Sequence, residues 1–343
     1  MEFRFKVNTE SQKPIYKQLI EQVEKSIADK HFTVGDYIPS MTEMAETLQI
    51  SKETVKKAYN ILRDRKVIDA LPGKGFYVCE KQQTTRILVL FDELSTYKQV
   101  IYDSFLQNIG DDVEIEFHLF NLDISLFEYL VENNLDNFDY YVITPHLPLQ
   151  PAIQKKAIQI LKKIPTRKLI LVDRYLKDLP GNFGSAYQDF DRDIYGALSQ
   201  CLDILKKYRK LNVVFAKGSL YAHFIAPGVQ KFCAENKIDF EIHYKFSPDI
   251  IKANEVYLVL SSRFEVELIE LVRHAKARKL RIGKNIGVIS YNESPVNEII
   301  LDGLSVFSTD FNQMGALAAK MINEKKNQKI RCDFRFIKRS SFR

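Results

Sequence analysis

The sequence predicts an α/β protein with a small, mainly helical module at the front and a larger doubly wound domain of two lobes behind it. Three observations lead to this prediction. Residues 38–59 hold two short amphipathic helices, each preceded by a serine that can cap it. Residues 80–85 are polar and aperiodic, which indicates a linker. After them, short apolar runs alternate with helical stretches, as in parallel sheets covered by helices. We therefore expect domains at residues 1–79 and 86–343.

Length and composition are those of a globular protein with room for two or three cores. The chain has 343 residues, of which 45% are apolar and 27% charged. No segment is apolar enough for a membrane-spanning helix and the first residues lack an apolar signal core, so we expect a cytoplasmic protein with no membrane partner. The four scattered cysteines show no metal-ligand spacing, so we expect free thiols, no metal and no cofactor.

The formal net charge of +6 is unevenly distributed. Residues 1–80 carry 13 Lys and Arg against 12 Asp and Glu, whereas residues 320–343 carry 9 against 2. We interpret the basic end as a solvated terminal segment. Any attraction of the front module to a polyanion must therefore come from the local arrangement of its lysines.

The capping pattern in residues 38–59 predicts a helix-turn-helix. Ser40 and Glu43 form a capping box for the first helix, and Ser51 caps the second. The residues at core spacing on the second helix are Val55, Ala58 and Leu62. Its outer face carries cationic and hydrogen-bonding side chains, which suit contact with base edges and phosphates. These are Lys52, Glu53, Lys56, Lys57 and Asn60.

A helix before this motif and a hairpin after it complete a winged module. Residues 14–30 predict a longer helix with Pro14 at its start. Residues 67–78 predict two strands around a glycine-rich tip formed by Gly73, Lys74 and Gly75. Glycines let the backbone approach a phosphate or a groove closely, and the lysine brings one cation there. A plain hairpin with a solvated lysine is the alternative.

The segments PIYKQL, PSMTEMA, SKETVKKAYNIL and GKGFYV resemble the winged-helix domain of GntR-type bacterial transcription regulators. The resemblance covers residues 13–79 and implies binding to double-stranded operator DNA. Together with the outer face described above, it gives the DNA-binding candidates Thr42, Ser51, Lys52, Glu53, Thr54, Lys56, Lys57, Gly73, Lys74 and Gly75.

The chain departs from this family at several of these positions. Arg is usual in the family where Thr42, Lys52 and Lys56 stand here. Lys lacks the bidentate fork of Arg, so we expect phosphate contact rather than base choice from the two lysines. Glu53 has two interpretations: it accepts a hydrogen bond from a cytosine amino group, or it holds Lys57 one turn further on.

The sequence of the larger domain predicts two successive series of alternating strands and helices. In the first, we expect strands at 87–91, 113–120, 140–144 and 168–172 and helices at 102–109, 125–133 and 152–163. In the second, we expect strands at 212–216, 240–246, 256–260 and 286–290 and helices at 193–207, 221–235 and 264–278. Two such lobes leave a cleft at the carboxyl ends of their strands, which is the default ligand pocket.

The order and spacing of five segments resemble the effector-binding core of LacI/GalR-type repressors, which has the type I fold of periplasmic sugar-binding proteins. The segments are LILVDR, DRDIYGAL, YLVLSS, IGKNIGVISYNE and VFSTDFNQMGALAAKMI. The whole chain is similar to the GntR-type regulators that bear such a core, among them the arabinose repressors. This resemblance implies a homodimer on a palindromic operator and a small sugar as effector, such as a pentose or a deoxyhexose.

The effector-binding candidates follow from matching positions and from the ends of the predicted strands. They are Tyr97, His146, Asp173, Arg174, His223, Ser261, Ser262 and Asn292. Carboxylate, guanidinium and amide groups suit neighbouring sugar hydroxyls, and an aromatic ring adds a stacking face. Four of these candidates also have a structural interpretation: a local ion pair or hinge support for Asp173 with Arg174, a half-buried helix residue for His223, and a turn cap for Asn292.

Two departures leave the effector open. Ser261 and Ser262 stand where the family has an Asn-Asp pair, and Asn292 stands where it has Asp. A smaller or deoxy sugar, a sugar phosphate paired with Arg174, another metabolite, or no effector at all are the alternatives. No G-x-S-x-G, H-E-x-x-H or Walker A pattern is present, which argues against an enzyme. We expect a DNA-binding regulator, and a repressor by analogy, of a carbohydrate-utilisation operon.

Overall fold

The computed structural model describes residues 5–11, 13–79, 84–260 and 265–343. They form a winged helix and a two-lobed α/β domain, each of which is described by itself. The predicted fold class is confirmed. No helix in these four ranges combines the length and the apolar character that crossing a membrane requires.

The front module is a winged helix. Its helices are α1 Ile15–Ala28, α2 Met41–Leu48 and α3 Lys52–Asp64, and its strands are β1 Tyr37–Ile38, β2 Ile68–Leu71 and β3 Gly75–Val78. The strands pair antiparallel in the order β1-β3-β2. Helix α3 packs on α1 and α2. Its fully buried side chains are Val55, Ala58, Tyr59 and Leu62.

Local hydrogen bonds position α2 and α3. Ser40 Oγ accepts from the Glu43 amide at 3.2 Å, and the Glu43 carboxylate accepts from the Ser40 amide at 2.8 Å, which is the predicted capping box. Gln49 ends α2 in the left-handed region at φ 54°. Ser51 Oγ then accepts from the Thr54 amide at 3.1 Å and starts α3. The turn between the helices is therefore fixed by residues close in sequence, as expected of capping signals.

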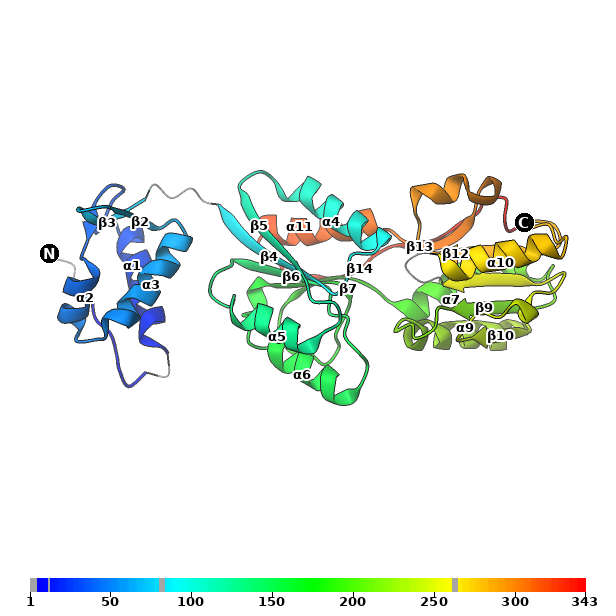
Figure 1. Ribbon diagram of the computed structural model, residues 1–343, viewed down its shortest axis with the longest axis horizontal. Coiled ribbons are helices and arrows are strands. Elements are labelled where there is room, and N and C mark those ends of the chain that lie inside the picture. The colour runs from blue at the N-terminus through cyan, green and yellow to red at the C-terminus, as the bar shows by residue number, and fades with distance from the viewer. Residues whose placement is uncertain (1–4, 12, 80–83, 261–264) are drawn as a thin grey trace. The chain divides into compact units, whose positions relative to one another are not determined.

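The first lobe has a six-stranded sheet in the order β14-β8-β7-β6-β4-β5. Its strands are β4 Thr85–Phe91, β5 Val113–Leu119, β6 Tyr140–Ile143, β7 Leu169–Arg174, β8 Gly184–Gln188 and β14 Lys329–Arg331. Its helices are α4 Thr96–Ile109, α5 Ile124–Glu132, α6 Pro151–Leu161 and α11 Phe311–Asn323. Helices α4 and α11 pack together on one face of the sheet, and α5 and α6 cover the other (Figure 1).

The second lobe has a six-stranded sheet in the order β10-β9-β11-β12-β13-β15. Its strands are β9 Leu211–Phe215, β10 Phe240–His243, β11 Val256–Leu260, β12 Gly287–Tyr291, β13 Ser305–Thr309 and β15 Phe334–Ile337, and its helices are α7 Phe190–Gln200, α8 Leu202–Leu205, α9 Ala222–Asn236 and α10 Val266–Ala277. Helices α7 and α9 pack together in one core and α10 packs in another (Figure 1). Short 3-10 turns lie at Thr166–Lys168, Pro248–Ile250, Pro295–Glu298 and Ile300–Asp302.

The chain passes between the lobes three times, after β8, after β13 and after β14. The crossing segments are tied to one another by hydrogen bonds. The Cys332 amide donates to the Tyr187 carbonyl at 2.9 Å, and the Asp310 amide donates to the Asp333 carbonyl at 2.8 Å. Three crossings joined in this way are the kind of connection about which two lobes can open and close as bodies.

Two expectations about the larger domain are wrong. The basic end is not a solvated segment: β14 pairs parallel with β8, β15 pairs antiparallel with β13, and Phe342 is fully buried. The predicted helix at 193–207 is two helices, because α7 ends at Gln200 and α8 follows it. Strand β8 was not predicted, since its sequence GSAYQ lacks the apolar run that marks the other strands.

Candidate functional site

The outer face of α3 and the tip of the wing carry the predicted DNA-binding residues. Those that are exposed are Thr42, Ser51, Lys52, Glu53, Lys56, Lys57, Gly73 and Lys74, while Thr54 and Gly75 are partly buried. Because Val55, Ala58, Tyr59 and Leu62 hold the opposite side of α3 in the core, the cationic side faces outward. Near the start of a helix such a face suits phosphate groups, since the helix dipole adds to the charge of the lysines.

Glu53 and the lysines of α3 are arranged differently from the predicted pairing. The Glu53 carboxylate lies 3.5 Å from Lys56 Nζ, an exposed i,i+3 pair. Lys57 instead lies over the ring of Tyr16 in α1, with 4.1 Å from its Nζ to the ring centroid. Lys52 has no carboxylate partner within the described ranges. Lys52 is therefore the cation of this helix that is most available to a phosphate.

The wing places Lys74 at the tip of the β2–β3 hairpin. Gly73 and Gly75 have φ of 77° and 101°, which other residues adopt only with strain. The Lys74 amide donates to the Leu71 carbonyl at 3.0 Å and closes the turn. The lysine side chain is thus presented on a defined turn.

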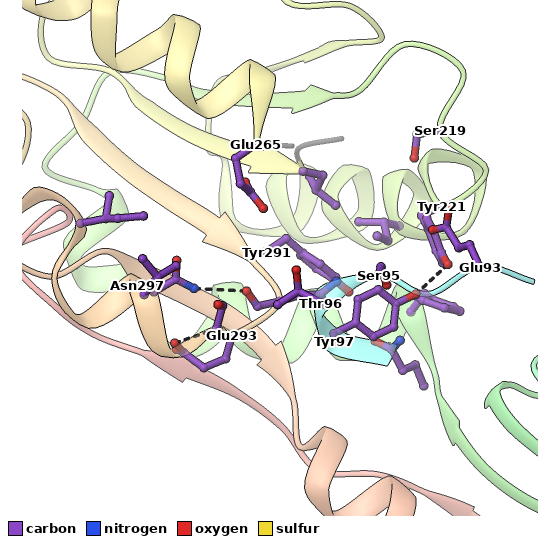
Figure 2. A pocket seen from close by; sticks show the side chains of 18 residues that line it. Glu93, Ser95, Thr96, Tyr97, Ser219, Tyr221, Glu265, Tyr291, Glu293 and Asn297 are labelled. Atoms are coloured by element: carbon purple, nitrogen blue, oxygen red, sulfur yellow. Dashed lines mark hydrogen bonds between the residues drawn. The ribbon is translucent and has the colours of Figure 1, made fainter. Parts of the chain in front are cut away.

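A cavity of about 200 Å³ lies between the two lobes. Its walls come from the carboxyl ends of β4, β8, β9, β11 and β12 and from the segments that follow them, which is the edge of an α/β sheet where ligands bind. Figure 2 shows the labelled polar side chains that line it: Glu93, Ser95, Thr96, Tyr97, Ser219, Tyr221, Glu265, Tyr291, Glu293 and Asn297. None of the lining residues that the structure describes is Lys, Arg or His.

Three buried polar atoms in this cavity have no hydrogen-bond partner among the described residues. They are Ser95 Oγ, the Tyr291 hydroxyl and Asn292 Oδ1. Burial raises the pKa of Tyr291 well above 10, so its hydroxyl keeps its proton. A buried polar atom without a partner costs roughly 1–3 kcal/mol, and its presence in a folded protein requires an explanation. A bound molecule that supplies partners from both lobes provides one.

Asp173 is the second-last residue of β7 and is fully buried, and side chains from other segments bind it. Its Oδ2 accepts from the Tyr97 hydroxyl at 3.1 Å and lies 2.9 Å from His146 Nε2, and its Oδ1 accepts from Gln188 Nε2 at 2.5 Å. Burial alone would raise the pKa of Asp173, but the charge and hydrogen bond of His146, with Lys98 and Gln188, lower it to about 2. This carboxylate is therefore engaged within the protein, and it orients Tyr97 rather than lining the cavity itself.

Tyr97 joins the lobes across the cleft. Its hydroxyl lies 2.7 Å from that of Tyr221, which precedes α9 in the second lobe (Figure 2). The ring of Tyr221 also lies against those of His146 and Phe190, with centroid distances of 5.2 and 5.9 Å. His146 therefore does not line the cavity itself, but it contacts Asp173 and also Tyr221, which lines the cavity.

The structure separates the remaining effector-binding candidates. Asn292, at φ 72°, lines the cavity together with Tyr97. Arg174 and His223 line a second cavity instead. Ser261 and Ser262 lie outside the described residues. Sequence reasoning missed the cavity residues Ser95, Tyr221 and Tyr291. Tyr291 ends β12 and Ser95 lies in the segment after β4, so the rule that ligands bind at strand ends could have identified both.

No group of three or more His, Cys, Asp or Glu side chains within the described residues is placed to hold a metal ion. Cys201, Cys233 and Cys332 are buried thiols, and Cys79 is half-buried. Burial raises the pKa of Cys332 to about 12, so this thiol remains protonated at neutral pH.

Comparison with known protein sequences gives matches to the front of the chain. Residues 15–78 match the model of the bacterial regulatory proteins of the gntR family. The chain is also 31% identical over 102 residues to the HTH-type transcriptional repressor YtrA of Bacillus subtilis (strain 168), a match that covers 29% of this chain and 76% of that protein.

Comparison with solved structures gives matches to the larger domain. The transcription regulator CcpA of Lactococcus lactis aligns with a TM-score of 0.59 and 16% identity over 76% of this chain and 100% of that one. A LacI family transcriptional regulator from Enterococcus faecium, solved with bound ribose, aligns with a TM-score of 0.57 and 17% identity over 75% of this chain and 98% of that one. At this identity the likeness shows a shared fold.

Proposed function

The chain belongs to the gntR family of bacterial regulatory proteins, and on that premise we propose that it is a repressor controlled by a neutral monosaccharide in the interlobe cavity. It is a transcriptional regulator that joins a gntR-type winged helix to a core with the fold of LacI-type regulators. We further propose that it controls a carbohydrate-utilisation operon, that it acts as a repressor and that a neutral monosaccharide is its effector.

The observation that carries the effector proposal is the set of unpaired polar atoms in the cavity. Ser95 Oγ comes from the first lobe, whereas the Tyr291 hydroxyl and Asn292 Oδ1 come from the second. A molecule with several neighbouring hydroxyl groups can donate to Asn292 Oδ1 and can donate to or accept from the two hydroxyls at the same time. Such a molecule bridges the lobes and favours their closure, because it gains these hydrogen bonds only when both walls are near.

The volume of the cavity and the chemistry of its lining indicate which class of effector it can bind. A cavity of about 200 Å³ is smaller than the roughly 300–1,000 Å³ of sites for drug-sized ligands, which supports a single pentose or deoxyhexose. The described lining offers carboxylates, which suit the hydroxyl groups of a neutral polyhydroxylated ligand. Arg174, the residue considered as a phosphate partner, lines the other cavity.

Regulation would follow from unequal affinity of the effector for the open and closed lobes. We infer that the protein acts as a homodimer, with two winged helices on a palindromic operator. We infer that closure of the lobes moves β4, which begins at Thr85, and thereby changes the geometry available to the DNA-binding modules. By linkage, a sugar that weakens operator binding must itself be bound more weakly when the protein is on the operator.

A thermal-shift panel of neutral pentoses, deoxyhexoses and hexoses on the full chain tests this function. A true effector at a hundredfold excess over its Kd stabilises the folded protein by about 2.7 kcal/mol. Tyr291→Phe removes only the unpaired hydroxyl and should weaken that sugar about tenfold without lowering the stability of the free protein. Tyr244→Phe, on an exposed ring outside the cavity, is the matched control. If no sugar in the panel raises the melting temperature, the proposed ligand class is wrong.

A further inference from the structure

A second cavity, of about 960 Å³, opens between the same two lobes. Its walls are α6 and the ends of β7 and β8 from the first lobe, and the first turns of α7 and α9 from the second. It shares Gln188 and Phe190 with the first cavity. The second cavity is therefore another compartment of the interlobe crevice, beyond the residues that hold Asp173.

The described lining of this compartment carries several cations, whereas the described lining of the first cavity carries none. Its cationic lining residues are Lys155, Lys162, Arg174, Lys177 and Arg192, with His223 beside them. Of its carboxylates, Asp189 lies 3.5 Å from Arg192. The five cations of the described lining stand against three carboxylates in all, Asp178, Asp189 and Asp191. The compartment thus carries excess positive charge that its own acidic groups do not offset.

Among these cations, Arg174 has a side chain that a ring contact and a hydrogen bond hold in a defined orientation. Its guanidinium lies on the ring of Phe224, 4.7 Å from the centroid, and its Nη2 donates to Gln154 Oε1 at 3.2 Å. A further contact, from Nη1 to the Pro145 carbonyl, is long at 3.5 Å. No carboxylate of the described residues lies within ion-pair distance of Arg174. A guanidinium fixed in one plane with donors to spare is suited to bidentate binding of a phosphate or carboxylate.

Aromatic rings line the same compartment. Phe190 stacks on Phe224 at 5.6 Å, and Tyr175 lies against Tyr187 at 5.0 Å. These rings place apolar surface beside the cations, and the volume of the compartment is in the range of roughly 300–1,000 Å³ typical of sites for organic ligands.

We propose that this compartment is a second ligand site, which binds a small organic anion with its phosphate or carboxylate on Arg174 and its remaining part against the aromatic rings. The site is separate from that of the neutral sugar. Both ligands would contact both lobes, so each would bias the same closure and change the affinity for the other by the same factor.

Isothermal titration calorimetry on the full chain with ribose 5-phosphate and with citrate tests the proposal. We expect at least one of the two anions to bind with a Kd below about 1 mM. Arg174→Gln should weaken it about tenfold or more, because a charge-assisted bidentate contact is lost. Arg167→Gln, the same change at an exposed position outside both cavities, should weaken it less than about twofold. Which anion binds distinguishes phosphate from carboxylate recognition.

Three outcomes would overturn the proposal. Neither anion binds up to about 10 mM; Arg174→Gln and Arg167→Gln have the same effect; or Tyr291→Phe, in the first cavity, weakens the anion as much as Arg174→Gln does. If Arg174→Gln does not fold, Lys177→Gln, at an exposed position of the same wall, is the variant to test. We expect it to bind the anion about threefold more weakly. Unchanged binding would contradict the site. A negative result for the anion site does not contradict the proposed sugar site, because the sugar site is tested separately with neutral ligands.

Discussion

The hydroxyl groups of Tyr97 and Tyr221 lie 2.7 Å apart across the crevice between the two lobes. Tyr97 donates its one proton to Asp173, so Tyr221 must be the donor to Tyr97. A buried carboxylate in the first lobe thereby determines the direction of a hydrogen bond to the second. The pair forms one wall of the sugar cavity and also links the lobes that the sugar would draw together.

Removing the two hydroxyls should have unequal effects on stability. Tyr221→Phe deletes one neutral hydrogen bond and should lower the free energy of unfolding by about 1 kcal/mol. Tyr97→Phe deletes that bond and also a donor to a buried carboxylate, so we expect a loss of about 2 kcal/mol. Urea unfolding of both variants measures the difference. Equal losses, or a larger loss for Tyr221→Phe, would show that Asp173 does not depend on Tyr97.

Asp173 should make stability depend on pH in the acid range. Its pKa is about 2 in the folded protein against an ordinary 3.8, so the unfolded chain takes up the proton first as the pH falls. Ionised Asp173 therefore contributes about 2 kcal/mol to the free energy of unfolding. This contribution is complete above about pH 4 and is lost as the pH approaches 2.

The comparison with Asp173→Asn isolates this effect. The difference in unfolding free energy between the natural protein and this variant should shrink between pH 5 and pH 2.5, measured by urea titration. Asp203→Asn, an exposed change in α8, should give a difference that stays flat over the same range. A constant difference for Asp173→Asn would contradict the low pKa.

Lys52 and Lys56 should contribute to DNA affinity through phosphates. If each neutralises one phosphate, Lys52→Ala with Lys56→Ala reduces the slope of log K against log salt by about 1.8, at about 0.9 per contact. Lys206→Ala with Lys207→Ala removes the same charge from an exposed part of the second lobe and should leave the slope unchanged. Fluorescence anisotropy with a selected operator, at several salt concentrations, gives both slopes. An unaltered slope for the α3 variant would remove α3 from the DNA interface.

Two glycines of the second lobe should respond to alanine in opposite directions. A Cβ at Gly228 of α9 would overlap the carbonyl oxygen of Asp191 in α7, so Gly228→Ala should destabilise by about 1–3 kcal/mol. Gly196 of α7 has open space around its Cβ position, and Gly196→Ala should stabilise by about 0.5–1 kcal/mol because alanine favours the helix. Thermal unfolding of the two variants measures both. The same sign for both would contradict the close packing of α7 on α9.

The front module could be predicted closely because its signals are local. Ser40, Glu43 and Ser51 act on backbone groups within three residues, and Val55 and Ala58 repeat at helical spacing. The pairing of Glu53 could not be predicted in the same way. Lys56 at i+3 and Lys57 at i+4 are both within reach of Glu53 on a helix, and Lys57 lies instead over the ring of Tyr16 in α1, far away in the sequence.

The larger domain could be predicted as alternating strands and helices, but its ends and its site could not. Strands β14 and β15 are short and basic, and only pairing with β8 and β13 makes them strands. Asp173 has the residue type of a sugar ligand, yet Tyr97, His146 and Gln188 already bind it. These partners come from segments up to 76 residues away, so a single segment carries no sign of the network.

The most direct test of the whole account is the affinity of the full chain for its selected operator with and without the monosaccharide that gives the largest thermal shift. We expect saturating sugar to weaken operator binding at least about fivefold, within the usual range of allosteric coupling. Tyr291→Phe should bind the operator normally but need about tenfold more sugar for the same release. Operator affinity that is indifferent to the sugar, or a Tyr291→Phe variant that responds at the same concentration as the natural protein, would contradict it.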